Sequence, residues 1–213
     1  MLFKVTDDSG FLAIIDPDAY RGFVHADWTW DTIQEHFRRE MRDRHLLIWG
    51  TGMEHFWSID VSFQPTRASG FREVVGSIGA SRGRLLLTNY ESLTMAAQFP
   101  DVTLPEAHER GQVLSVSPGL YDCRIVQLSD PKSGAPFEEP VSFIYEFTRA
   151  TSSREVWRER GLTTRRGEPG HITLTQKSHR MMSMPANLRF EGTRREVPSG
   201  FASAPQPQSV RPL

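Results

Sequence analysis

The residues of this chain that could do chemistry are its histidines and the carboxylates near them. His55 offers the densest local combination, because Glu54 precedes it and Asp60 follows within the same segment. His108, which is followed by Glu109, is a further candidate. A general base or nucleophile requires such groups to come within hydrogen-bond reach of each other. If Glu54, His55, Asp60 and His108 converge in a cleft between two layers of the fold, the chain is a hydrolase.

The seven histidines show no spacing that is typical of a metal site. The sequence contains no His-x-x-x-His, no His-Glu-x-x-His and no facial-triad pattern. Cys123, the single cysteine, cannot form an internal disulfide or a zinc cluster, and its place in an apolar run predicts an inert core thiol. Gly50-Thr51-Gly52 lacks the last glycine of a dinucleotide loop and precedes a strand pattern, so we interpret it as a turn. We therefore expect no metal and no cofactor.

Charge is distributed unevenly along the chain. Residues 1–150 carry 14 Lys and Arg against 21 Asp and Glu, a net charge of −7, whereas residues 151–213 carry 11 against 5, a net charge of +6. An acidic body repels phosphates and complements a basic protein surface. We expect another protein, a basic one, as the partner, and nucleic acid only for the basic C-terminal segment.

The chain lacks the features of a membrane or exported protein. No stretch approaches the roughly 18 apolar residues that a membrane span requires. The start, Met1-Leu2-Phe3-Lys4-Val5, leads directly into polar residues and has no apolar region of signal-peptide length. Together with the single cysteine, these observations predict a cytoplasmic protein without membrane contact.

Two kinds of periodicity predict the main elements. Alternation of apolar and polar residues predicts strands over 55–63 and 141–147, with Trp57 and Phe143 facing a shared interior. Apolar residues at spacings of three and four predict a helix over 29–44, with His36 on its solvated side. Residues 91–99 form a second short helix, which Asn89 caps and Pro100 ends.

Turn-like sequences separate several pairs of apolar runs and predict three β-hairpins, which join 2–5 to 11–15, 74–78 to 84–88, and 113–116 to 120–128. Residues 46–49 read as a short buried strand, 101–111 as a loop and 172–175 as an edge strand. Short strands at this spacing predict a mainly β (α+β) fold, namely a two-layer antiparallel β-sandwich or open barrel with two short helices. We expect one domain over 1–180 and a basic, Pro-rich, disordered tail over 181–213.

Three stretches within residues 1–150 carry a resemblance to a known group of proteins. They are Leu46–Gly52, which precedes an amphipathic strand, then Gly83–Thr88, and finally Val116–Arg124, which contains a Pro-Gly-x-Tyr turn. They look like the bacterial β-sandwich proteins typified by the competence-protein-J-like nuclease inhibitors and similar immunity-like families. The resemblance implies a stoichiometric binder of another protein. It carries over no active-site residue.

These observations leave three hypotheses. The leading one is a non-catalytic protein-binding domain, of the inhibitor or immunity type, whose acidic body complements a basic partner. The first alternative is the hydrolase with a His/carboxylate site between the layers. The second is a small-ligand carrier, with Trp and Phe side chains lining a pocket.

Overall fold

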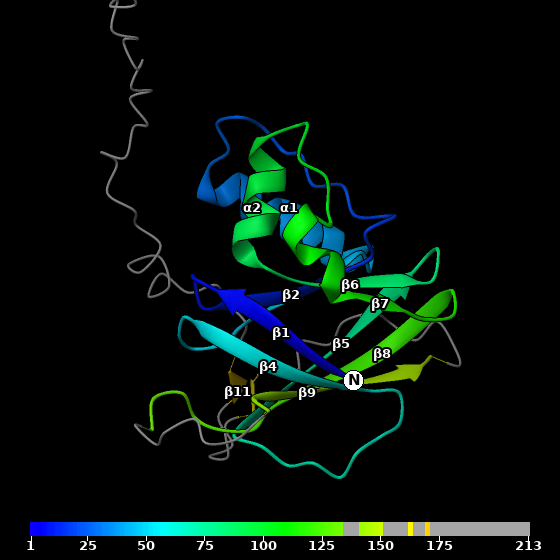
Figure 1. Cartoon of the computed structure of the whole chain (residues 1–213). Helices are drawn as coiled ribbons and strands as arrows, with labels where there is room; N and C mark the ends of the chain where they lie inside the picture. The colour runs from blue at the N-terminus through cyan, green and yellow to red at the C-terminus, as the bar shows by residue number, and fades with distance from the viewer. Residues whose placement is uncertain (134–140, 151–161, 164–168, 171–213) are drawn as a thin grey trace, which may run out of the picture. The chain divides into compact units, whose positions relative to one another are not determined.

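A computed structural model describes residues 1–133, 141–150, 162–163 and 169–170, which all belong to the compact unit Met1–Thr175 (Figure 1). The domain boundary at residue 180, the tail over 181–213 and the strand over 172–175 lie outside the described residues. These three expectations stay predictions.

Two sheets form the body of this unit. Sheet A has the order β1-β4-β9-β8-β5, and only its β4–β9 pair is parallel. Its strands are β1 (Leu2–Asp7), β4 (His55–Ser62), β5 (Arg72–Ala80), β8 (Gly119–Gln127) and β9 (Phe143–Arg149). Sheet B is antiparallel with the order β3-β2-β6-β7, and its strands are β2 (Phe11–Ile15), β3 (Leu46–Gly50), β6 (Arg84–Asn89) and β7 (Val113–Ser115). Two short strands, β10 (Leu162–Thr163) and β11 (Pro169–Gly170), pair separately. The α+β class is confirmed.

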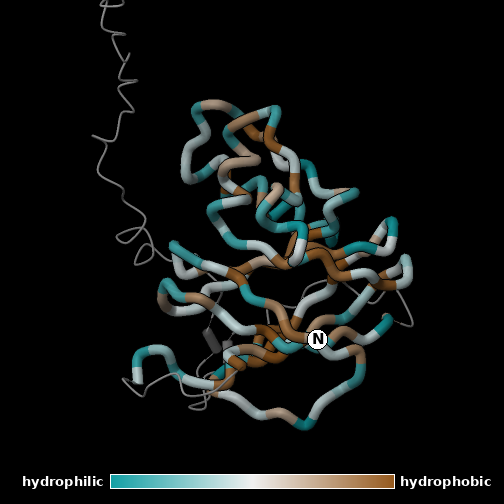
Figure 2. The backbone as a smooth tube through the Cα atoms, in the orientation of Figure 1, coloured by the Kyte–Doolittle hydropathy of each residue, from teal (hydrophilic) through white to brown (hydrophobic). Residues whose placement is uncertain are grey.

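The two sheets differ in how many of their faces are buried. Side chains of both sheets fill one core between them, where Trp57, Phe143 and Tyr145 are each 1% exposed. The other face of sheet B packs against the helices through a second core, which includes Ile15, Leu46, Leu86 and the helical residues Ile33, Phe37 and Leu93. Figure 2 shows the apolar segments gathered in the strands of both sheets. Sheet B is therefore buried on both faces, which explains why its strands read as continuous apolar runs while those of sheet A alternate.

The three predicted hairpins are wrong, because each of their turns carries the chain from one sheet to the other. β1 pairs with β4 and not with β2, β5 pairs with β8 and not with β6, and β7 pairs with β6 and not with β8. Gly10 (φ 78°) and Gly83 (φ 74°) allow the chain to reverse in two of these turns. A tight turn reverses the direction of the chain, but it does not determine which strands pair. Because β2 and β6 are apolar on both faces, they must lie in a sheet that is covered on both sides, and this requirement selects their partner strands.

These crossings gather at two corners of the sandwich. The first corner holds the β1–β2 turn (8–10) and the β3–β4 turn (51–54), and the second holds the β5–β6 turn (81–83) and the β7–β8 turn (116–118). The strand directions place each pair of turns at a common end.

The helices lie over sheet B, on the side away from sheet A (Figure 1). Helix α1 (Trp30–Arg42) begins at Thr29, whose Oγ1 accepts a hydrogen bond from the Thr32 amide, and α2 (Tyr90–Gln98) begins at Asn89, whose side chain accepts from the Ser92 amide. Both predicted helices are confirmed. None of the helices in the described parts of the chain is long and apolar enough to cross a membrane.

Three local expectations are corrected. His36 is buried and not solvated, because Tyr20 from the segment after β2 covers that flank of α1; its ring contacts Tyr20, and burial lowers its pKa. The predicted loop over 101–111 contains a 3-10 helix, η1 (Ala107–Gln112), anchored by the buried Glu109. Phe63, the last residue of the strand predicted over 55–63, lies just beyond β4 and is 40% exposed.

Candidate functional site

The four residues expected to form a hydrolase site are spread over two elements and a turn. Glu54 lies exposed in the β3–β4 turn, and His55 begins β4 with its ring against that of Trp57, 5.1 Å between centroids. Asp60 is five residues further along β4, about 16 Å away at 3.3 Å per residue, and on the opposite face of the sheet. His108 is exposed on η1. The structure thus keeps Glu54 and His55 together at the first corner and places Asp60 elsewhere, and the hydrolase hypothesis stays a prediction.

The first corner is built around the buried carboxylate of Asp7, which is 1% exposed. Its Oδ1 accepts hydrogen bonds from the amides of Ser9 (3.1 Å), Gly10 (2.7 Å) and Phe11 (2.9 Å). This pattern is how an aspartate closes a turn that follows its own strand.

The second oxygen of Asp7 ties the neighbouring turn and the core to the same carboxylate. Oδ2 accepts from Thr51 Oγ1 (2.8 Å) and from the indole Nε1 of Trp57 (3.0 Å). Because the two donors come from the β3–β4 turn and from β4, one side chain fixes both turns of the corner. A carboxylate saturated in this way is a structural group and not a general base.

Three further carboxylates lie around this anchor. Asp8 and Glu54 are exposed, and Glu91, in the first turn of α2, is half-buried. Burial raises the pKa of Glu91, a hydrogen bond with Ser9 opposes this shift, and the negative charges of Asp7 and Asp8 add to it. No ion pair between these carboxylates and a basic side chain occurs within the described parts of the chain. The carboxylates of the first corner therefore have no ion-pair partner among the described residues, and Arg72, beside the β3–β4 turn, donates to the Gly50 carbonyl instead.

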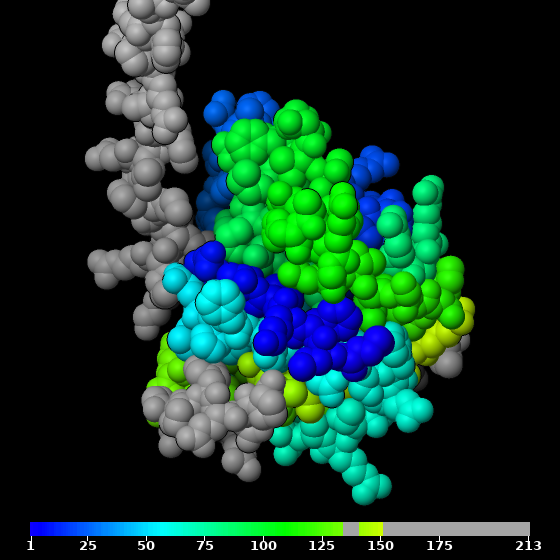
Figure 3. All heavy atoms as spheres, viewed as in Figure 1, coloured from blue at the N-terminus to red at the C-terminus, as the bar shows by residue number. Residues whose placement is uncertain are grey.

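An exposed aromatic ring lies next to these charges. Phe56, two residues after Glu54, is 75% exposed, the largest value among the exposed large hydrophobic side chains of the described residues. It lies on the outer face of sheet A, opposite Thr6 of β1. Figure 3 shows the surface where β1, in blue, and β4, in cyan, lie side by side. Together, Asp8, Glu54 and Phe56 form a surface with an apolar centre and an acidic rim, which we call the acidic corner surface.

The second corner has the same kind of anchor but balanced charges. Asp16, 1% exposed, accepts hydrogen bonds from the amides of Asp18 (3.0 Å) and Ser81 (2.6 Å). Asp18 forms a two-point ion pair with the Arg84 guanidinium, whose hydrogen bond lowers the pKa of Asp18; Arg82 lowers it further.

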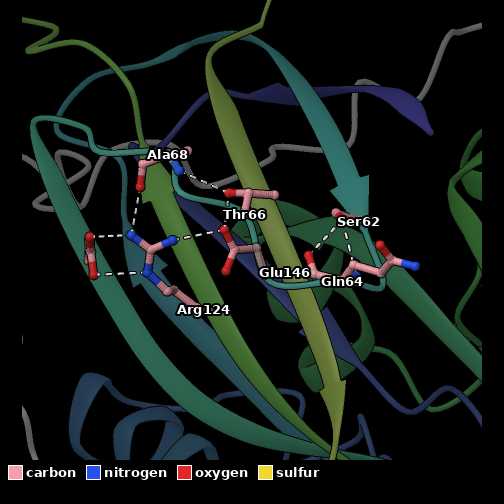
Figure 4. Close-up of polar contacts among 7 residues, drawn as sticks. Ser62, Gln64, Thr66, Ala68, Arg124 and Glu146 are labelled. Atoms are coloured by element: carbon pink, nitrogen blue, oxygen red, sulfur yellow. Dashed lines mark hydrogen bonds and ion pairs between the residues drawn. The ribbon is translucent and has the colours of Figure 1, made fainter.

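Another polar cluster lies on the outer face of sheet A, and Figure 4 shows its contacts. Arg124 of β8 binds Glu73 of β5 and Glu146 of β9 (2.8 Å), and its guanidinium also donates to the Ala68 carbonyl (2.8 Å). Thr66 donates a hydrogen bond to Glu146. Since Thr66 and Ala68 belong to the β4–β5 connection, these bonds pin that connection across the sheet. The cluster is fully paired, which is typical of a structural network.

Two of these features, the turn at Asp7 and the exposure of Phe56, could be predicted from the sequence. Asp7-Asp8-Ser9-Gly10 has the composition of a turn, and alternation along 55–63 puts Phe56 on the outward row. The proximity of Glu91 to Asp8 has no sequence signal, because 83 positions separate them. Within the described parts of the chain, no group of three or more His, Cys, Asp or Glu side chains could hold a metal ion.

Comparison with known proteins gives a weak structural resemblance. No protein-family model and no curated protein matches the sequence. Among solved structures, the chain resembles a protein described as crocagin biosynthetic gene J, with 14% identity and a TM-score of 0.45 over 70% of this chain and 94% of that one. It also resembles ComJ from Bacillus subtilis, an inhibitor of the DNA-degrading activity of NucA, with 8% identity and a TM-score of 0.42 over 70% of this chain and 96% of that one. The weak resemblance to competence-protein-J-like proteins noted in the sequence is confirmed.

Proposed function

We propose that this protein is a non-catalytic protein-binding domain, of the inhibitor or immunity type, and that it binds a basic protein partner through the acidic corner surface. The observation that carries the proposal is that the exposed carboxylates of Asp8 and Glu54, which form no ion pair among the described residues, lie next to the exposed ring of Phe56.

The charge arrangement supports binding because it is unfavourable in the isolated protein. Asp7 pairs with His55 across β1 and β4. Asp8 directly follows Asp7 and Glu54 directly precedes His55, so two exposed carboxylates lie next to each other at the ends of neighbouring strands. Like charges in such positions repel each other. A basic surface docked here would relieve this repulsion. It would also speed association and make the affinity fall with salt.

Phe56 supplies the apolar part of the interaction. Interfaces concentrate their binding energy in a few central residues, with aromatic rings prominent among them, inside a polar rim. A ring that is 75% exposed, next to Glu54, fits that role. Burying it against the partner would contribute about 1.5–3 kcal/mol, on the scale for a large apolar side chain.

Affinity capture with matched baits tests the proposal. The wild-type chain, the D8K/E54K variant and the control variant R82E are immobilised and exposed to a native lysate at low salt, and captured proteins are identified by mass spectrometry. Arg82 is an exposed side chain of the second corner, so R82E changes charge away from the proposed surface.

The proposal predicts a protein with a strongly basic surface that wild type and R82E retain, that D8K/E54K loses, and that elutes as salt rises. The affinity of the purified partner for D8K/E54K should be at least about tenfold weaker. Capture of no protein at low salt, or equal capture by all three baits, would contradict the proposal.

A further inference from the structure

Two polar atoms in the core between the sheets have no hydrogen-bond partner among the described residues. They are the hydroxyl oxygen of Tyr145, on β9, and the indole Nε1 of Trp49, on β3. The two residues are 1% and 2% exposed. A buried donor without an acceptor loses its hydration and gains nothing in return, so such groups are rare in folded proteins and call for an explanation.

The two atoms belong to rings that touch. The Tyr145 and Trp49 rings meet edge to face, with 5.3 Å between centroids and 81° between planes. The rings come from opposite sheets, and both residues belong to the core between those sheets.

The same core satisfies its other buried polar rings. The Trp57 indole donates to Asp7 Oδ2 at 3.0 Å, and the Tyr121 hydroxyl donates to the Ser117 carbonyl at 2.7 Å. The fold thus supplies partners for two rings and leaves two contacting rings without one. Burial raises the pKa of Tyr145 and the charge of Asp7 raises it further, so this part of the core is not purely apolar.

We propose that an ordered water molecule occupies the core beside these rings, where it accepts a hydrogen bond from Trp49 Nε1 and bonds the Tyr145 hydroxyl. Buried waters of this kind occur where two or more polar groups would otherwise stay unpaired, and each typically makes about three hydrogen bonds. The water would link β3 of sheet B to β9 of sheet A across the interior. It is a binding site separate from the acidic corner surface.

Crystallography and a pair of variants test this site. A crystal structure at about 1.8 Å or better should show a density peak within about 2.7–3.2 Å of both Tyr145 Oη and Trp49 Nε1. Absence of that peak, with only carbon atoms around the two polar atoms, would overturn the proposal. So would an indole N–H that points at the face of the Tyr145 ring while the hydroxyl has no contact.

The variants Y145F and Y121F supply the second readout. Y121F removes a hydroxyl whose partner is known, so it sets the scale for losing one buried hydrogen bond. If a held water bonds Tyr145, Y145F should lower the thermal unfolding midpoint to a similar extent. If the hydroxyl is truly orphaned, Y145F should raise the midpoint, because a desolvated polar group disappears without loss of a bond. A raised midpoint would therefore contradict the proposal.

Discussion

The two corners of the sandwich solve the same structural problem with the same residue type. Each turns the chain from one sheet to the other, and each is held by an aspartate that is 1% exposed, Asp7 at the first corner and Asp16 at the second. Both carboxylates accept hydrogen bonds from turn amides. A short acidic side chain at a strand end is therefore sufficient to fix a crossing between sheets.

The corners differ in the charges around these anchors. At the second corner the Arg84 guanidinium pairs with Asp18 and lowers its pKa, whereas at the first corner burial and the nearby Asp7 and Asp8 raise the pKa of Glu91. One corner is arranged so that charges stabilise the fold. At the other, the buried position of Glu91 disfavours its charged form, and such a departure from local consistency is expected where a surface serves a function.

The largest expected effect is on stability, at the anchors themselves. D7A should lower the free energy of unfolding by about 3–4 kcal/mol, because it leaves three amides and an indole without their acceptor. D16A removes the acceptor of two amides and should cost about 1–3 kcal/mol. Urea denaturation measures both. A larger loss of unfolding free energy for D16A than for D7A would contradict the role of Asp7 as the main anchor of the first corner.

Neutralising one carboxylate at each corner should change stability in opposite directions. The pKa of Glu91 is raised in the folded state, so its contribution is favourable below its unfolded pKa and is lost as pH rises through the folded value. E91Q should therefore raise the thermal unfolding midpoint at pH 7. The pKa of Asp18 is lowered, so its contribution is present at neutral pH and is lost as pH falls through the folded value. D18N should lower the midpoint at pH 7, by less than D16A.

Thermal unfolding of wild type, E91Q and D18N at acidic pH gives a second test of these two carboxylates. Each difference from wild type should shrink once the native carboxyl is protonated in both the folded and the unfolded state. That point comes at a higher pH for Glu91 than for Asp18. If E91Q and D18N shift the midpoint in the same direction at pH 7, the two corners do not differ electrostatically as described.

The smallest expected stability change is at Phe56. F56S should change the free energy of unfolding by no more than about 0.5 kcal/mol, since the ring is 75% exposed and packs little in the free protein. The same change should weaken binding of the basic partner at least about tenfold. Calorimetric titration alongside urea denaturation separates the two effects. Unchanged affinity with intact folding would remove Phe56 from the docking surface.

The sequence predicted which residues face the core better than it predicted which strands pair. Alternation placed Trp57 and Phe143 inside, because a side-chain period of two is a local property of the strand. The three hairpins were wrong because partner choice depends on the second apolar face of β2 and β6, which becomes evident only when the helices are placed over it. His36 was misplaced for the same reason, since Tyr20 covers it from outside the helix.

For the candidate site, the sequence supplied the acidic excess but not its location. Glu54 and Phe56 are close in sequence, and their exposure follows from the turn and the strand period. The contribution of Glu91 requires α2 to start beside the β1–β2 turn, which is a tertiary contact. Asp60 belonged to the predicted cluster by sequence distance alone, and the extended geometry of β4 carries it to the far end of the strand.

If the first corner gathers exposed carboxylates that have no ion-pair partner, a cationic molecule should bind there in preference to the rest of the surface. An NMR titration of the ¹⁵N-labelled protein with deca-lysine, a simple cationic probe, tests it most directly. We predict that the largest amide shift changes occur at Asp8, Glu54, Phe56 and Glu91, that they weaken as salt rises, and that D8K/E54K abolishes them. Shift changes spread evenly over the surface, or centred on the second corner, would contradict the claim.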